Sequence, residues 1–165
     1  MSVSTDILRS YRAPRDVFRG LRGGDRREAR ILIYLMTACG LFFVAQWPVV
    51  ARQAHLDDSI PLEARMAGAL FGAIFIAPLV FYGLGWVLTM ILKMIERGID
   101  GFDVRLALFW SLLAISPLML FQGLVLALVG PGSQANLSGV VIFGLFLMIL
   151  VAGLRVALEA ARSRA

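Results

Sequence analysis

The chain has 165 residues, of which 59% are hydrophobic, and its formal net charge is +5. Soluble domains are about 45–50% apolar, and here the excess lies in blocks of about 20 residues, the length that crosses a hydrocarbon core of about 30 Å. This composition excludes an ordinary soluble domain and predicts a polytopic helical membrane protein. Because the blocks are continuously apolar rather than alternating, we do not expect a β-barrel.

The first thirty residues form a basic segment that contains eight arginines. Its pattern predicts two short helices. Ser4 is placed to cap the first of them. In the second helix, Pro14, Val17, Phe18 and Leu21 follow the i, i+3, i+4, i+7 spacing of an apolar stripe. Gly23 and Gly24 are expected to end this helix.

An apolar stripe with arginines beside it is typical of a helix in the membrane interface, where anionic lipid adds about 1 kcal/mol for each basic residue. We therefore expect segment 1–30 to lie on the cytoplasmic leaflet. Two alternatives stay open: the arginines act only as a topology signal, or the segment binds a specific partner. We expect no nucleic-acid partner, because lipid and topology explain the arginines. The expected lipid contacts are Arg12, Arg15, Phe18, Arg19, Leu21 and Arg22.

Four apolar blocks follow, separated by connections that are rich in proline, glycine and charge. They predict an all-α, four-transmembrane-helix bundle over residues 31–160, between the basic segment and a short tail, 161–165. The second block is longer than a bilayer requires, so it must tilt, kink or protrude, and Pro78 is a natural kink site. The four predicted spans are about 31–50, 67–95, 106–129 and 137–157.

Lysine and arginine alternate between many and few along the connections, which by the positive-inside rule places both termini in the cytoplasm. No A-x-A cleavage site follows the first block, so we expect that block to stay in the protein as a helix. Trp47 lies at the outer end of the first span, Trp110 near the inner end of the third and Trp86 on the inner half of the second. Tryptophans near the interfaces are expected as anchors. The basic segment has eight arginines. After it, the basic residues are Arg52 and Arg65 in the first connection, Lys93, Arg97 and Arg105 in the second, none in the third, and Arg155, Arg162 and Arg164 at the C-terminal end.

Small and polar residues inside the spans are candidates for helix packing or partner contact. Gly68-x-x-x-Gly72 lets two backbones approach closely, either within this chain or with a partner protein. Gln46 and Gln122 both fall toward the outer side of the membrane. There they either hydrogen-bond between helices or line a polar pocket.

Residues that carry chemistry are scarce. Cys39 is the only cysteine and His55 the only histidine, so no intrachain disulfide, thiol pair or His-rich metal site is expected. No P-loop, GxSxG or HExxH motif occurs, and we expect no enzyme activity, no cofactor and no metal. The acidic residues are assigned to a solvated outer loop (Asp57, Asp58 and Glu63) and to local cytoplasmic pairs (Glu96 with Lys93, Asp103 with Arg105).

The segment APRDVFRGL resembles the P-x-x-x-F opening of bacterial Yip1-domain proteins, the YIP1 family. YLMTACGLFFVAQWP, ARQAHLD and RLALFWSLLAISPLMLFQGL are also similar to members of that family, over about residues 6–155. The resemblance implies a bacterial inner-membrane protein in which a short amphipathic segment precedes a compact helical bundle. It implies no catalytic residues. The family is usually described with five membrane helices, whereas this sequence predicts four.

Three functional hypotheses follow. The first is a non-catalytic integral membrane protein that is an accessory or structural subunit of a larger membrane complex, or a membrane organiser. The second is a small oligomeric transporter or channel, which rests on Pro78, Pro117 and the two glutamines. An intramembrane enzyme ranks last, because no nucleophile–base pair can be named.

Overall fold

The computed structural model describes residues 3–24, 26–57 and 59–163. Every regular element in this part of the chain is a helix. Four of the helices are long and apolar enough to cross a membrane, which confirms the predicted all-α four-helix membrane bundle. Asp58 and Arg164, which entered the sequence predictions, lie outside the described residues.

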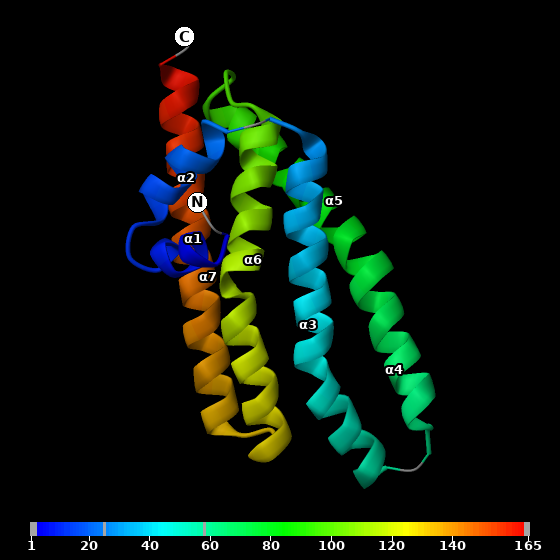
Figure 1. Ribbon diagram of the computed structural model, residues 1–165. Coiled ribbons are helices and arrows are strands. Elements are labelled where there is room, and N and C mark those ends of the chain that lie inside the picture. Colours follow the sequence, from blue (N-terminus) through cyan, green and yellow to red (C-terminus); the bar gives the residue numbers. More distant parts are fainter. Residues whose placement is uncertain (1–2, 25, 58, 164–165) are drawn as a thin grey trace.

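α6 is the central helix, flanked by α3 on one side and α7 on the other, and α5 packs against its first half (Figure 1). Each span extends beyond its apolar block, because polar and charged residues at the ends continue the helical turns. α3, for example, runs through Pro48 to Leu56. The spans are α3 (Glu28–Leu56), the continuous run of α4 (Leu62–Phe71), η1 (Gly72–Ile76) and α5 (Ala77–Ile95), α6 (Gly101–Leu128) and α7 (Ser133–Arg162).

The irregularity expected in the second span occurs one turn before Pro78. η1 is a π-helical turn that joins α4 to α5, and Pro78 is the second residue of α5. A proline inside a helix lacks the amide hydrogen and its ring collides with the carbonyl four residues earlier. A widened turn at that place absorbs the misfit without ending the helix.

The best-buried part of the molecule is the first half of α6. Residues 102–116 are buried there, except for the half-buried Arg105. Trp110, expected as an interfacial anchor, is instead fully buried. Its ring meets Tyr34 of α3 edge-on at a centroid distance of 5.2 Å, and Nε1 donates a 2.9 Å hydrogen bond to Ser10 Oγ. The N-terminal segment covers this ring, and the sequence pattern did not reveal that cover.

At the end of the bundle that holds the α6–α7 connection, α3 approaches α6 closely and caps it. At the crossing of α3 and α6, a Cβ on Gly123 would collide with the Ala45 carbonyl. Arg52, counted in the sequence as a loop residue, lies in α3 and donates to the carbonyls of Leu126 and Ala127 at 3.4 and 2.9 Å. A cation at the last carbonyls of a helix is stabilising, so Arg52 fixes the end of α6.

Two short helices precede the bundle, α1 (Val3–Ser10) and α2 (Pro14–Arg22), as the sequence predicts. They do not extend away from the spans. Both lie on the side of the molecule formed by α6 and α7, and α2 lies nearer than α1 to the end of the bundle that holds the chain's C-terminus (Figure 1).

Candidate functional site

The apolar stripe of α2 is covered by protein. The Phe18 side chain is 3% exposed and Val17 is 5% exposed. The Phe18 ring lies against Gly153 of α7, where an added Cβ would be 2.6 Å from a ring carbon. The sequence prediction that Phe18 contacts lipid is therefore wrong in this structure, because the bare backbone at Gly153 makes room for the ring. Leu21 is half-buried and packs against the same core.

α1 is held by two polar contacts with α6. Ser10 Oγ accepts the hydrogen bond from Trp110 and donates to the carbonyl of Asp6 at 2.8 Å. The Tyr11 hydroxyl donates to the carbonyl of Ala114. Burial raises the pKa of the Tyr11 phenol above its ordinary value, so it remains a hydrogen-bond donor at neutral pH.

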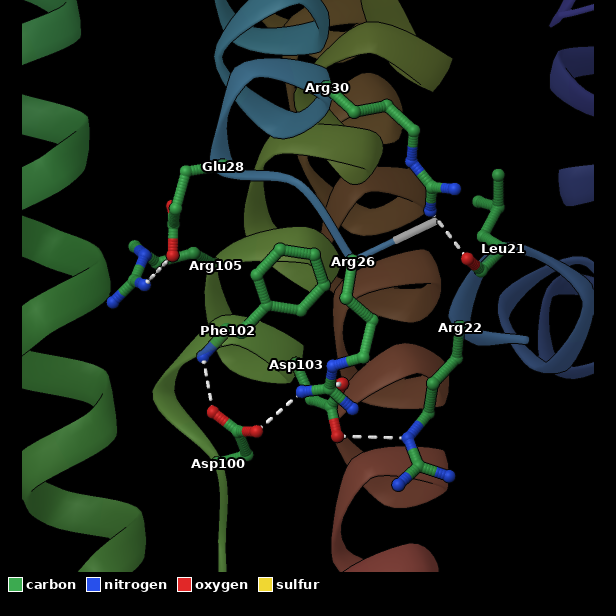
Figure 2. Close-up of polar contacts among 9 residues, drawn as sticks. All are labelled: Leu21, Arg22, Arg26, Glu28, Arg30, Asp100, Phe102, Asp103 and Arg105. Carbon is green, nitrogen blue, oxygen red and sulfur yellow. Dashed lines mark hydrogen bonds and ion pairs between the residues drawn. The ribbon is translucent and has the colours of Figure 1, made fainter. Parts of the chain in front are cut away.

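Arginines of the N-terminal segment bind carboxylates at the first turn of α6 (Figure 2). Arg22 Nε donates to Asp103 Oδ2 at 2.8 Å, and the Asp103 side chain is 4% exposed. Arg26 pairs with Asp100, and its Nη2 lies 3.5 Å from Asp103 Oδ1. A buried carboxylate requires such partners, because an unpaired buried charge is strongly unfavourable.

The same residues start α6. Asp100 caps the helix by accepting a 2.9 Å hydrogen bond from the amide of Phe102. Asp100 and Asp103 are negative charges at a helix N-terminus, where the helix dipole stabilises them. The Arg26 guanidinium lies over the Phe102 ring, 4.9 Å from its centroid. We call the pairs of Arg22 and Arg26 with Asp100 and Asp103 the N-terminal clamp.

The expected local ion pairs are wrong. Arg105 pairs with Glu28 at the start of α3 rather than with Asp103 (Figure 2), because residues two apart on a helix do not face each other. Glu96 accepts a 3.3 Å bond from Arg162 of α7 rather than pairing with Lys93. The backbone at Glu96 is extended after the end of α5, which removes the helical spacing that the local pair required.

The remaining arginines of the segment differ in their contacts. Arg19 lies 3.5 Å from Asp16 and 3.3 Å from Glu159 of α7, but these side chains are all more than half exposed. Exposed pairs contribute about 0–1 kcal/mol, so they support the clamp only weakly. Arg12 and Arg15 are exposed and pair with no residue that the structure describes.

The small-residue motif of the second span lines an open groove. Gly68 and Gly72 contribute to a cavity of about 350 Å³ between α3 and the α4–η1 run, together with Gln46 and Cys39. An added Cβ on either glycine would meet no atom within 4 Å. The motif therefore does not bring two helices of this chain together. The close contacts occur instead at Gly123 and Gly153. Sequence reasoning missed them because it searched for Gly-x-x-x-Gly, whereas each of these glycines starts a Gly-x-x-x-Ala spacing.

The two glutamines take different roles. Gln122 Nε2 donates to the carbonyl of Ala135 at 2.8 Å, and its Oε1 accepts from Ser138, so it joins α6 to the first turns of α7. Gln46 is exposed on α3. Gln46, Gln53 and Gln122 also line a cavity of about 320 Å³ between α3 and α6. Gln122 therefore makes the interhelical hydrogen bonds that the sequence suggested for both glutamines, and both glutamines line a cavity whose surface is mostly apolar.

Fold and site together define a multi-pass α-helical membrane protein whose N-terminal segment is clamped to its own bundle. Comparison with known proteins adds no relative: the chain matches no family model, no curated protein and no solved structure. Among the described residues, no three His, Cys, Asp or Glu side chains are grouped so that they could hold a metal ion.

Proposed function

We propose that the protein is a non-catalytic integral membrane protein that serves as an accessory or structural subunit of a larger membrane complex, or as a membrane organiser. One observation carries this proposal. In the α4–η1–α5 run, 17% of the most apolar stretch is buried, against 22% in α3, 28% in α7 and 44% in α6. Large apolar side chains are exposed along most of this run, among them Phe71, Phe75, Leu79, Trp86, Met90 and Met94.

The open groove beside this run supports a protein partner. Gly68 and Gly72 face it without a close neighbour, so the backbone of another helix has room to approach. Small residues at such spacing favour close helix association in lipid, where packing rather than hydrophobic exclusion drives assembly. We therefore assign the groove between α3 and α4–η1 as the first contact surface to test.

The proposal includes a place in the cell and a family. We place the protein in the bacterial inner membrane, with both termini cytoplasmic, as a member of the YIP1 family. The start of α3, which follows the basic segment, and the C-terminal end of α7 lie at the same end of the bundle, which supports placing both termini on one side of the membrane (Figure 1). The order of an amphipathic segment and then a helical bundle supports the family assignment.

The test is purification from the native membrane in a mild detergent, followed by mass spectrometry. We expect partner proteins at fixed stoichiometry. Gly68→Leu/Gly72→Leu should remove them, while Gly144→Leu, at another exposed glycine whose added Cβ meets nothing within 4 Å, should retain them. Recovery of the wild-type chain alone, or only as a homo-oligomer, would contradict the accessory role.

A small oligomeric transporter or channel is the second candidate, and the glutamine-lined cavity favours it. Polar side chains facing a cavity between spans are the arrangement that a polar solute needs. The test is solute flux in proteoliposomes. The double variant Gln46→Ala/Gln122→Ala should abolish flux if this function is correct, and unchanged flux would exclude a role for these glutamines.

A further inference from the structure

Five of the eight arginines of the N-terminal segment fall into two groups by their contacts. Arg19, Arg22 and Arg26 pair with carboxylates of the protein. Arg12, in the turn between α1 and α2, and Arg15, the second residue of α2, are exposed and have no ion pair within the described part of the chain. The first group explains how the segment is held. The second group leaves two positive charges for a partner outside the protein.

The position of this turn along the bundle limits the kinds of partner that the two arginines can bind. Tyr11 bonds to Ala114, the fourteenth residue of α6, and at 1.5 Å per residue it lies about 20 Å from the start of that helix. α7 carries no charged residue between Ser133 and Leu154. The turn therefore lies beside a part of α6 that carries no charged residue, because the last charged residue of that helix, Arg105, precedes Ala114 by nine positions. An arginine beside a bilayer at this depth is costly unless an anion pairs with it.

A cavity of about 580 Å³ lies at the same turn. It is lined mainly by apolar surface from Leu8, Tyr11 and Ala13, with Arg9 and Arg12 among its other lining residues. Leu8 is 69% exposed, although it is a large apolar side chain. Apolar surface beside guanidinium groups suits a molecule with both a hydrocarbon chain and an anionic phosphate, because arginine binds phosphate oxygens bidentately.

We propose that the turn between α1 and α2 binds an anionic phospholipid of the adjoining leaflet. Arg12 and Arg15 bind the headgroup phosphate, and Leu8 contacts an acyl chain. This differs from docking through the apolar stripe of α2, which is buried against α7. The site is independent of the accessory role, because it lies on the α6–α7 side and the groove of Gly68 and Gly72 lies between α3 and α4–η1.

The experiment is native mass spectrometry of the full chain in detergent, titrated with dioleoylphosphatidylglycerol or dioleoylphosphatidylcholine. We expect selective binding of phosphatidylglycerol. Arg12→Gln/Arg15→Gln should weaken that binding about tenfold or more, since each basic residue near anionic lipid contributes a several-fold factor. The control Lys93→Gln/Arg97→Gln removes the same charge from two exposed residues at the α5–α6 connection and should change binding less than twofold.

Three results would overturn the proposal: equal binding of the two lipids by the wild type, unchanged phosphatidylglycerol binding in the double variant, or an equal loss in the control. Displacement of the lipid by millimolar inorganic phosphate would also overturn it, in favour of a free-phosphate site. If Arg12→Gln/Arg15→Gln fails to stay monodisperse, the single variant Leu8→Gln tests the proposal instead. Weaker phosphatidylglycerol binding at unchanged charge then supports the site, and unchanged binding rejects it.

Discussion

Asp103 of α6 accepts a 2.8 Å hydrogen bond from Arg22 of α2, across 81 residues of sequence, with 4% of its side chain exposed. This pair fixes the first helices of the chain to the start of the central span. Removing one partner of a mostly buried ion pair is unfavourable, because the remaining charge then lies in the protein without an opposite charge beside it. The clamp should therefore be sensitive to substitution of either partner.

Asp103→Asn should destabilise the protein by about 3 kcal/mol, the lower end of the range for breaking a buried pair, because Arg22 keeps some access to water. We expect faster amide exchange in α1 and α2 and a lower unfolding midpoint in detergent. The control is Asp16→Asn, whose pair with Arg19 is exposed on both sides and should contribute less than about 1 kcal/mol. Equal effects of the two substitutions would contradict the clamp.

Phe18→Ala should cost about 3 kcal/mol or more, because it removes a buried ring and leaves a cavity against Gly153. The loss should be similar in detergent and in nanodiscs of different lipids, as measured by thermal unfolding. Leu8→Ala is the control, since Leu8 is 69% exposed and makes a much smaller contribution to packing. If the loss of stability in Phe18→Ala depended on the lipid and disappeared in detergent, Phe18 would contact the membrane interface rather than α7.

The number and type of spans could be predicted from the sequence, because a hydrocarbon core selects for long apolar runs whatever their neighbours. The burial of the apolar stripe of α2 against α7 could not be predicted from the sequence. This stripe is equally compatible with a bilayer and with a protein face. The choice depends on Gly153, 135 positions away from Phe18, where the absence of a side chain admits the ring.

The ion pairs show the same limit. Sequence proximity suggested Asp103 with Arg105, but helix geometry turns these side chains apart. The observed partners, Arg22 for Asp103 and Glu28 for Arg105, come from chain segments that only the packing of α2 and α3 on α6 brings near. The sequence singled out arginines of the N-terminal segment as lipid contacts, whereas Arg19 and Arg22 pair with carboxylates of the protein. Their division between protein and solvent required the three-dimensional arrangement.

Gly123→Ala should destabilise the bundle, because a Cβ at this position collides with the backbone of Ala45 and forces α3 and α6 apart. Overpacking of this kind costs about 1–3 kcal/mol. Gly144→Ala is the matched control: an added Cβ there meets nothing within 4 Å, and alanine favours a helix over glycine. Unfolding midpoints in one detergent measure both variants. Equal midpoints would show that α3 and α6 do not approach closely at this crossing.

Asp57, between α3 and α4, should titrate at an unusually low pH. Hydrogen bonds from Ser59, and then from Arg65 at 2.8 Å, hold its pKa at about 2, below the ordinary 3.8. A carboxylate with a lowered pKa stabilises the folded connection above pH of about 4, and this contribution is lost as the pH falls through about 2. Carbon-13 NMR of the aspartate carboxyl groups measures the midpoint. Ser59→Ala and Arg65→Gln should each raise it, whereas Glu63→Gln, outside this contact, should not. A wild-type midpoint near 4 would show that these hydrogen bonds do not hold the carboxylate in solution.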